Sequence, residues 1–177
     1  MKTLIYFLLS FIYVGARAQT PIKIGKIKAK HEIFIIHELR KLAGNDSPKI
    51  VVYSESNKYN NGMPQPKNEK YSMLINPQDL HMDVNLVKPI VFEVLSNKLQ
   101  QLKANKETLV IIMNFTTQGE ACDVSFSMKK NTVISIEDIE EIDSRLRKTI
   151  HMTFIGQQYK NHEVLPGKFI PTIDFNQ

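Results

Sequence analysis

The pattern of apolar residues is clearest between Leu109 and Met128, where it predicts a β-hairpin. Five consecutive apolar residues, Leu109 to Met113, are typical of a buried strand. A turn signal follows around Gly119, and apolar and polar residues then alternate, as in a strand with one buried face. The apolar positions of this second strand are Cys122, Val124, Phe126 and Met128. We therefore expect Cys122 to be a buried apolar side chain and not a reactive thiol.

Amphipathic helices are predicted on both sides of this hairpin. From Pro89 to Ala104, Phe92, Leu95, Leu99 and Leu102 recur at helical spacing, and Pro89 suits the first helical position. From Ile136 to Ile150, the helix follows Ser135, with Asp138 placed for a capping-box contact. Acidic residues precede basic ones in this second helix, which suits the helix dipole. The same spacing allows the ion pairs Glu141–Arg145 and Asp143–Arg147.

The N-terminal half gives weaker patterns. Pro21–Ala29 alternates isoleucines with lysines and predicts a short edge strand or an arm that orders by pairing. Lys30–Ala43 is interpreted as a helix that ends at a Gly-Asn pair, although its isoleucines also suit a strand. Ile50–Ser54 and Tyr71–Ile75 are predicted to be strands. Residues 54–70, rich in asparagine, are predicted to form a long mobile loop or a hairpin tip.

The last strand is predicted at Phe169–Phe175, where apolar residues alternate once more. Pro171 has no N–H to donate, which places this strand at a sheet edge or at a bulge. The predicted order is α-β-β-α-β-β-α-β, an α+β fold with helices packed on a small antiparallel or mixed sheet. We expect residues 19–87 and 88–177 to pack as one domain.

The first eighteen residues predict a cleavable secretory signal. Lys2 precedes an apolar run from Leu4 to Val14, and a small-x-small site ends at Ala18. The run is shorter than the ~20 residues of a membrane anchor, and no later segment is apolar enough to span. The single cysteine, Cys122, lies far from the cleavage point and excludes both a lipid acceptor there and an internal disulfide. We expect a soluble exported protein, periplasmic or extracellular, without a lipid anchor.

Composition and charge narrow the function classes. Hydrophobic residues make up 42% and charged residues 23% of 177, which is typical of a globular protein. Loss of Lys2 and Arg17 with the signal lowers the formal charge from +5 to +3. The densest basic cluster is Lys23, Lys26, Lys28 and Lys30. We interpret these lysines as residues that keep other strands away from a sheet edge, in preference to residues that contact an acidic surface or headgroup. Nucleic acid is not an expected partner.

No catalytic or metal-binding motif is present in the sequence. His31 and His37 lie six residues apart, whereas two histidines that share one metal from one helix lie four apart. His81, His151 and His162 are isolated, and no nucleophile elbow or phosphate-binding glycine loop occurs. We predict no catalytic residue, no cofactor and no metal. The alternative is a hydrolase whose site gathers these dispersed histidines with acidic residues.

From Lys88 onward the chain resembles the C-terminal domain of the TonB family. The matching pieces occur in the order helix, strand, turn with glycine, strand, helix and last strand. They are Pro89–Ala104, Leu109–Phe115, Gln118-Gly119, Cys122–Met128, Ile136–Ile150 and Phe169–Phe175. The Tyr-Pro pair, the proline-rich spacer and the retained anchor of an energy transducer are missing. The resemblance implies a fold that binds partner peptides along a sheet edge.

These patterns together predict a binding or adaptor domain and not an enzyme. The expected partner is a protein or peptide of the cell envelope or beyond, which adds a strand to an exposed edge. The proposed edge residues are Phe169, Ile170, Pro171, Thr172 and Ile173; the Pro21–Ala29 arm is the other candidate edge. A homodimer joined through the same edge is a further alternative.

Overall fold

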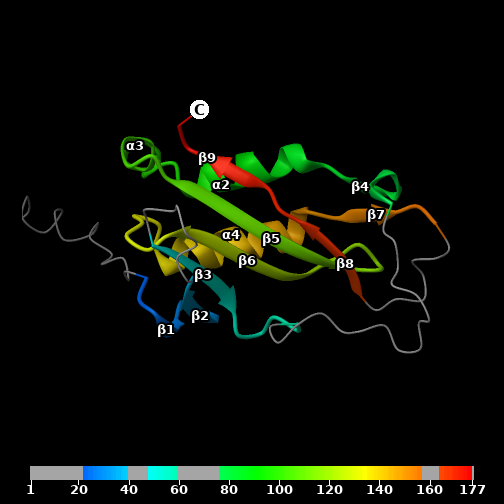
Figure 1. Cartoon of the computed structure of the whole chain (residues 1–177), viewed down its shortest axis with the longest axis horizontal. Helices are drawn as coiled ribbons and strands as arrows, with labels where there is room; N and C mark the ends of the chain where they lie inside the picture. The colour runs from blue at the N-terminus through cyan, green and yellow to red at the C-terminus, as the bar shows by residue number, and fades with distance from the viewer. Residues whose placement is uncertain (1–21, 40–47, 60–75, 157–163, 177) are drawn as a thin grey trace, which may run out of the picture.

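An antiparallel sheet of seven strands forms the centre of the protein (Figure 1). The computed structural model describes residues 22–39, 48–59, 76–156 and 164–176. The strand order is β1-β2-β3-β6-β5-β8, and β9 also pairs with β5. The strands are β1 (Gly25–Lys28), β2 (Ile33–Glu38), β3 (Lys49–Ser54), β5 (Thr108–Thr116), β6 (Ala121–Lys129), β8 (Val164–Phe169) and β9 (Thr172–Asp174).

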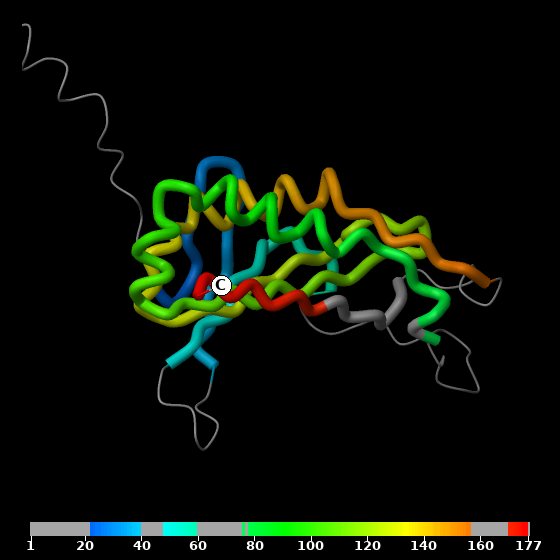
Figure 2. The backbone as a smooth tube through the Cα atoms, turned by 90° about the horizontal axis from the view of Figure 1, so that it is seen from above, coloured from blue at the N-terminus to red at the C-terminus, as the bar shows by residue number. Residues whose placement is uncertain are grey.

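Helices cover one face of this sheet, so the fold is α+β. The helices are α2 (Val87–Val94), α3 (Leu99–Ala104) and α4 (Ile136–Thr149). In Figure 1 α4 passes behind β5 and β6, and in Figure 2 the helices lie on one side of the strands. A second, two-stranded sheet pairs β4 (Leu80–Met82) with β7 (Met152–Phe154), and short 3-10 helices occupy Pro77–Asp79 and Val84–Leu86. Within the described ranges, no helix is long and apolar enough to cross a membrane.

The core lies between the sheet and the helices. Alternate residues of each central strand point toward the helices and are fully buried, as period-two geometry requires. From the strands these are Phe34, Ile36, Ile50, Val52, Leu109, Ile111, Met113, Phe115, Val124, Phe126 and Met128. The helices contribute Val91, Leu102, Ile139, Ile142 and Leu146, and the turn after α2 contributes Leu95. Burying each such side chain contributes roughly 1.5–3 kcal/mol, so this layer holds the fold together.

The predicted hairpin is confirmed, with one difference at Cys122. Strands β5 and β6 pair in register from Val110 opposite Ser127 to Asn114 opposite Asp123, and then Phe115 pairs with Ala121. Cys122 is therefore an extra residue, a β-bulge. The bulge turns Ala121 into the core and leaves Cys122 half-buried. The expectation that Cys122 is buried beside Val124 is thus only partly met.

The predicted helix over Lys30–Ala43 is wrong where the structure describes the segment. Ile33–Glu38 forms strand β2, which pairs with β1 on one side and β3 on the other. Phe34 and Ile36 are buried, whereas Ile33 and Ile35 are partly exposed on the opposite face. Because apolar side chains lie on both faces of this strand, its sequence lacks the apolar–polar alternation of a half-buried strand. Pairing with β1 and β3 stabilises the extended conformation, which β-branched isoleucines also favour.

The predicted helix over Pro89–Ala104 is broken into two. Helix α2 ends at Val94, residues 95–98 form turns, and α3 begins at Leu99. Lys98 lies in this break with a buried side chain and pairs with the Asp138 carboxylate at the start of α4. Lys98 thereby joins this break to the N-terminal cap of α4, since Asp138 is also the capping-box residue.

Helix α4 confirms the predicted Ile136–Ile150 element closely. The Ser135 hydroxyl accepts the Asp138 N–H, and the Asp138 carboxylate accepts the Ser135 N–H at 2.7 Å, which completes the capping box. Both predicted ion pairs, Glu141–Arg145 and Asp143–Arg147, are present.

Strands from the two predicted portions of the chain share the large sheet. β3, from residues 19–87, pairs with β6, from residues 88–177, with Ile50 opposite Met128. The predicted signal peptide, most of the 54–70 loop and the Tyr71–Ile75 strand lie outside the described residues.

Candidate functional site

The predicted edge residues lie at one end of the strand order, on the outer side of β5. β8 pairs with β5 through Phe169 opposite Met113, and β9 pairs through Ile173 opposite Leu109. Between β8 and β9 the strand is interrupted at 170–171, as the missing N–H of proline predicts. The Pro171 carbonyl still accepts the Ile111 N–H at 3.0 Å. The final strand is therefore an edge strand with a break in it.

Two residues of β9 turn their backbone polar groups away from the sheet. The Ile111 N–H bonds to the Pro171 carbonyl, and the Phe175 N–H bonds to the Glu107 carbonyl. In residues 171–175, the odd-numbered residues are therefore the ones whose backbone groups bond to β5 and the residue before it. In an antiparallel ladder, consecutive residues direct these groups to opposite sides. The N–H and C=O groups of Thr172 and Asp174 consequently face outward, where a further strand would bind.

The side chains of this edge divide between core and solvent. Ile173 is 5% exposed and anchors β9 in the core, whereas Ile170 is 51% exposed and Thr172 is also exposed. Pro171 is half-buried. Of the proposed residues, Ile170 and Thr172 are thus accessible to a partner, and Ile173 fixes the strand that carries them.

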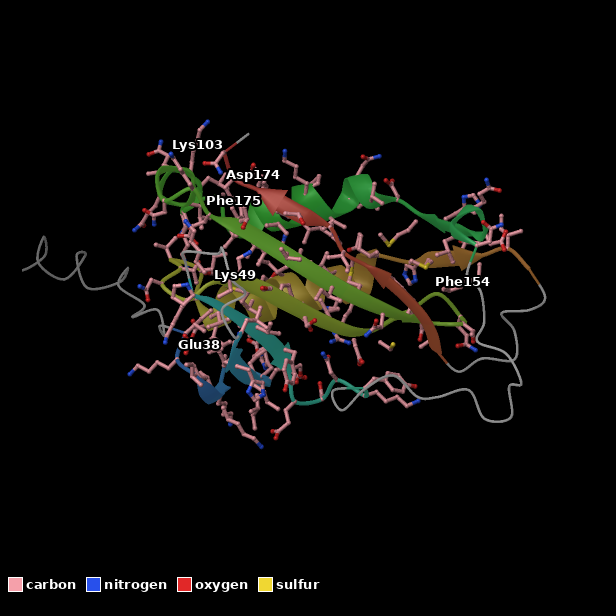
Figure 3. The ribbon with its side chains drawn as sticks, viewed as in Figure 1. Glu38, Lys49, Lys103, Phe154, Asp174 and Phe175 are labelled. Carbon is pink, nitrogen blue, oxygen red and sulfur yellow. The ribbon has the colours of Figure 1, made fainter. Side chains whose placement is uncertain are left out.

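The C-terminal end of β9 is held by neighbouring side chains. The Phe175 ring stacks on Phe92 of α2 with centroids 5.7 Å apart. The backbone N–H and side-chain amide of Asn176 bond to the Asp174 carboxylate and, with the nearby Lys88 charge, lower its pKa. Figure 3 shows Asp174 and Phe175 at the end of the molecule opposite Phe154. Asp174 is therefore an anchored, ionised group at the rim of this edge.

A polar network beneath the bulged end of β6 was not anticipated from the sequence. The Arg147 guanidinium donates to the Asp143 carboxylate at 2.8 Å, to the Cys122 carbonyl at 2.7 Å and to the Asn57 side chain. The Asn57 amide in turn donates to the Val124 carbonyl at 2.9 Å. Arg147 thereby satisfies β6 carbonyl groups that lie beyond the end of β3.

A second carboxylate on α4 holds the turn between β1 and β2. Glu140 accepts backbone N–H groups from Lys30, His31 and Glu32, at 3.2, 2.7 and 2.7 Å. Such charge-assisted bonds are about twice as strong as neutral ones. Glu140, Asp143 and Arg147 recur at spacings of three and four, so a polar stripe beside the apolar stripe of α4 was the available signal in the sequence.

Burial raises the pKa of Asp143, and this effect outweighs the hydrogen bond and the charge of Arg147, which lower it; the charges of Glu32 and Glu140 add to the increase. Its Oδ1 atom has no hydrogen-bond partner within the described part of the chain. The folded protein therefore binds a proton at Asp143 more tightly than the unfolded chain does. The stability that this proton contributes is fully present below ~3.9, the pKa in the unfolded chain, and is lost as pH rises through the higher pKa of the folded state.

Asp143→Asn should make the protein at least as stable as the wild type at pH 7, because the amide oxygen can still accept from Arg147 without a buried charge. The wild type should gain stability relative to the variant as pH falls from 7 to 4. Urea unfolding of both proteins between pH 4 and 7 measures this. A variant less stable than the wild type by the same amount at every pH would contradict the expected role of this proton.

The described histidines that the hydrolase alternative requires belong to two parts of the fold, the β1–β3 strands with their turns and the β4–β7 sheet. His31 lies in the turn held by Glu140, and the His37 ring lies 2.9 Å from the Tyr53 hydroxyl. His81 and His151 lie on the β4–β7 side of the protein, and His162 is outside the described residues. Among the described residues no three of His, Cys, Asp and Glu are grouped to hold a metal.

Cys122 is poorly suited to act as a nucleophile. Burial, followed by the neighbouring Asp123 charge, raises the pKa of the thiol to about 11. Its Sγ donates to the Asn114 carbonyl at 3.3 Å. A thiol that remains protonated at neutral pH lacks the thiolate that nucleophilic chemistry requires.

Comparisons with known proteins give a fold relationship alone. No family model matches the chain, and no curated protein matches it. A crystal structure of a DUF5043 family protein from Bacteroides uniformis ATCC 8492 superposes with a TM-score of 0.56 at 13% identity. The match covers 89% of this chain and 87% of the other. The two proteins therefore share a fold over nearly their whole lengths, and the TonB resemblance stays a prediction.

Proposed function

We propose that this chain is an exported binding module that takes an extended segment of a protein partner onto the β8–β9 edge by strand addition. The observation that carries the proposal is the outward direction of the Thr172 and Asp174 backbone groups on the last strand. Main-chain hydrogen bonds to such groups supply affinity in strand addition, and side-chain contacts supply specificity. The exposed Ile170 side chain offers an apolar contact beside them.

The surrounding packing favours binding without rearrangement. Ile173 is buried, and Phe175 stacks on Phe92, so β9 is fixed from the core side and at its C-terminal end. A preorganised edge loses little conformational entropy when a partner binds. The resemblance to the TonB family, whose members bind peptides along a sheet edge, points the same way. Export itself rests on the signal-peptide pattern of residues 1–18.

Photo-cross-linking from Ile170 in the exporting cell tests this proposal. A photoreactive residue at Ile170 should give a discrete adduct, whereas one at the exposed Lys148 of α4 should not. Thr172→Pro should reduce the adduct roughly fivefold to tenfold, because it removes one outward N–H that contributes about 1 kcal/mol and no bond to β5. The matched control Thr172→Val keeps the N–H and should retain the adduct.

The result also distinguishes the alternatives. An adduct of twice the chain's mass, together with a dimer in light scattering, would identify the partner as a second copy. Absence of any adduct from Ile170, or an adduct that Thr172→Pro leaves unchanged, would refute strand addition at this edge.

A further inference from the structure

We propose that the opposite edge of the sheet, strand β1, is a second docking site that selects extended acidic segments with carboxylates at alternate positions. β1 ends the strand order and pairs only with β2 among the described strands. Lys26 and Lys28 on this strand, and Lys23 and Lys30 just beyond its two ends, are all exposed. This site is independent of the β8–β9 edge and does not rest on the function proposed above.

The backbone of β1 has the polarity that a further strand requires. Its odd-numbered residues pair with β2: the Ala29 N–H bonds to the Glu32 carbonyl at 2.9 Å, and Ile27 lies opposite Phe34. The N–H and C=O groups of Lys26 and Lys28 therefore point away from the sheet. Glu140 fixes the turn that follows β1 through three backbone N–H groups, so this edge is already ordered before a partner arrives.

The side chains of β1 determine the partner's chemistry. Lys26 and Lys28 lie opposite Ile35 and Ile33, on the face of the sheet away from the helices. Lys26 pairs with Glu55, and no ion pair is formed by Lys23, Lys28 or Lys30 within the described residues. An added strand would place residues i and i+2 beside Lys26 and Lys28 on this face. A carboxylate at one position would pair with the Lys28 ammonium group, and a carboxylate at the other would share the Lys26 ammonium group with Glu55.

Lysines at an edge also keep unwanted strands away, and this explains the selectivity. Two β1 edges brought together would place ammonium groups side by side, which disfavours pairing with a second copy. An acidic strand is attracted at the same positions. The same lysines therefore disfavour pairing with a second β1 edge and favour pairing with an acidic strand. The partly exposed Ile24 and Ile33, at 51% and 38%, provide apolar contacts beside the lysines.

Titration with synthetic peptides, followed by amide NMR of the whole chain, tests this inference. The probe is a capped Thr-Glu-Val-Glu-Val-Thr peptide, and its controls are the Lys-for-Glu peptide and a Glu-Glu-Val-Val reordering of equal charge. The probe should shift and protect the amides of Gly25–Lys28, bind at least several-fold more tightly than the reordered peptide, and weaken with salt. The lysine peptide should not bind.

Matched variants separate charge from backbone. Lys26→Gln combined with Lys28→Gln should weaken the probe roughly tenfold, since each edge charge pair contributes a few-fold. Lys26→Pro should weaken it more than Lys26→Gln, and unchanged β2 and β3 resonances would show that the sheet remains intact. The inference would be overturned if both acidic peptides bound equally, or if only β9 amides shifted. It would also be overturned if no peptide bound at millimolar concentration, or if the protein bound phosphatidylglycerol vesicles but no peptide.

Discussion

Gly119→Ala should lower the free energy of unfolding by about 3 kcal/mol or more, the largest effect expected from one added methyl group. Gly119 has a φ of +89°, and a Cβ there would lie 2.1 Å from the Met152 carbonyl oxygen of β7. The hairpin turn and β7 are joined here, since the Met152 N–H bonds to the Gly119 carbonyl at 2.9 Å. Backbone must therefore move to admit the methyl group. Thermal unfolding should show a decrease in Tm of roughly 6–12 °C.

Gly25→Ala is the matched control for this prediction. Gly25 has a φ of +115°, but among the described residues, apart from its two chain neighbours, no atom lies within 4 Å of the position a Cβ would take. Only backbone strain remains, which costs roughly 1–2 kcal/mol. A Gly119→Ala loss no larger than that of Gly25→Ala would mean that the turn and β7 do not meet as closely as described.

Arg147→Met should cost about 2–4 kcal/mol at pH 7, because it leaves the buried Asp143 carboxylate and two backbone carbonyls without their cation. The methionine retains most of the apolar stem of arginine, so lost packing contributes little. Protonation of Asp143 should relieve part of this cost, and the deficit should be smaller at pH 4 than at pH 7. Urea unfolding at both pH values measures it.

Arg145→Met provides the control on the same helix. Arg145 also forms an i,i+4 pair, with Glu141, and a pair with Glu93, but its side chain is 37% exposed. Exposed pairs contribute 0–1 kcal/mol each, so this variant should unfold nearly as the wild type does. Equal losses for the two arginine variants would refute a special role for the network at Arg147.

Local patterns predicted those elements whose conformation depends on neighbouring residues in the sequence. The capping box of Ser135 and Asp138, the i,i+4 pairs of α4 and the alternating β6 strand are all set within a few residues. The edge position of the last strand also followed from one local fact, the missing N–H of Pro171.

Features that depend on distant partners were not predictable in this way. Whether Ile33–Glu38 forms a helix or a strand is decided by β1 and β3, which pair on either side of it. The bulge at Cys122 is visible only in the pairing of β6 with β5. Asn57 and Arg147 join across 90 positions of chain, and no local spacing connects them.

The pairing of β3 with β6 has a consequence for how the chain acquires its structure. The meander β1-β2-β3 is synthesised early, yet β3 can complete its pairing only after β6 has been synthesised. Loop-closure entropy must be overcome before this long-range contact forms, so folding should be slow and concerted with the C-terminal half. The N-terminal half should therefore stay unfolded until the C-terminal half is available, a property that would suit the export proposed above.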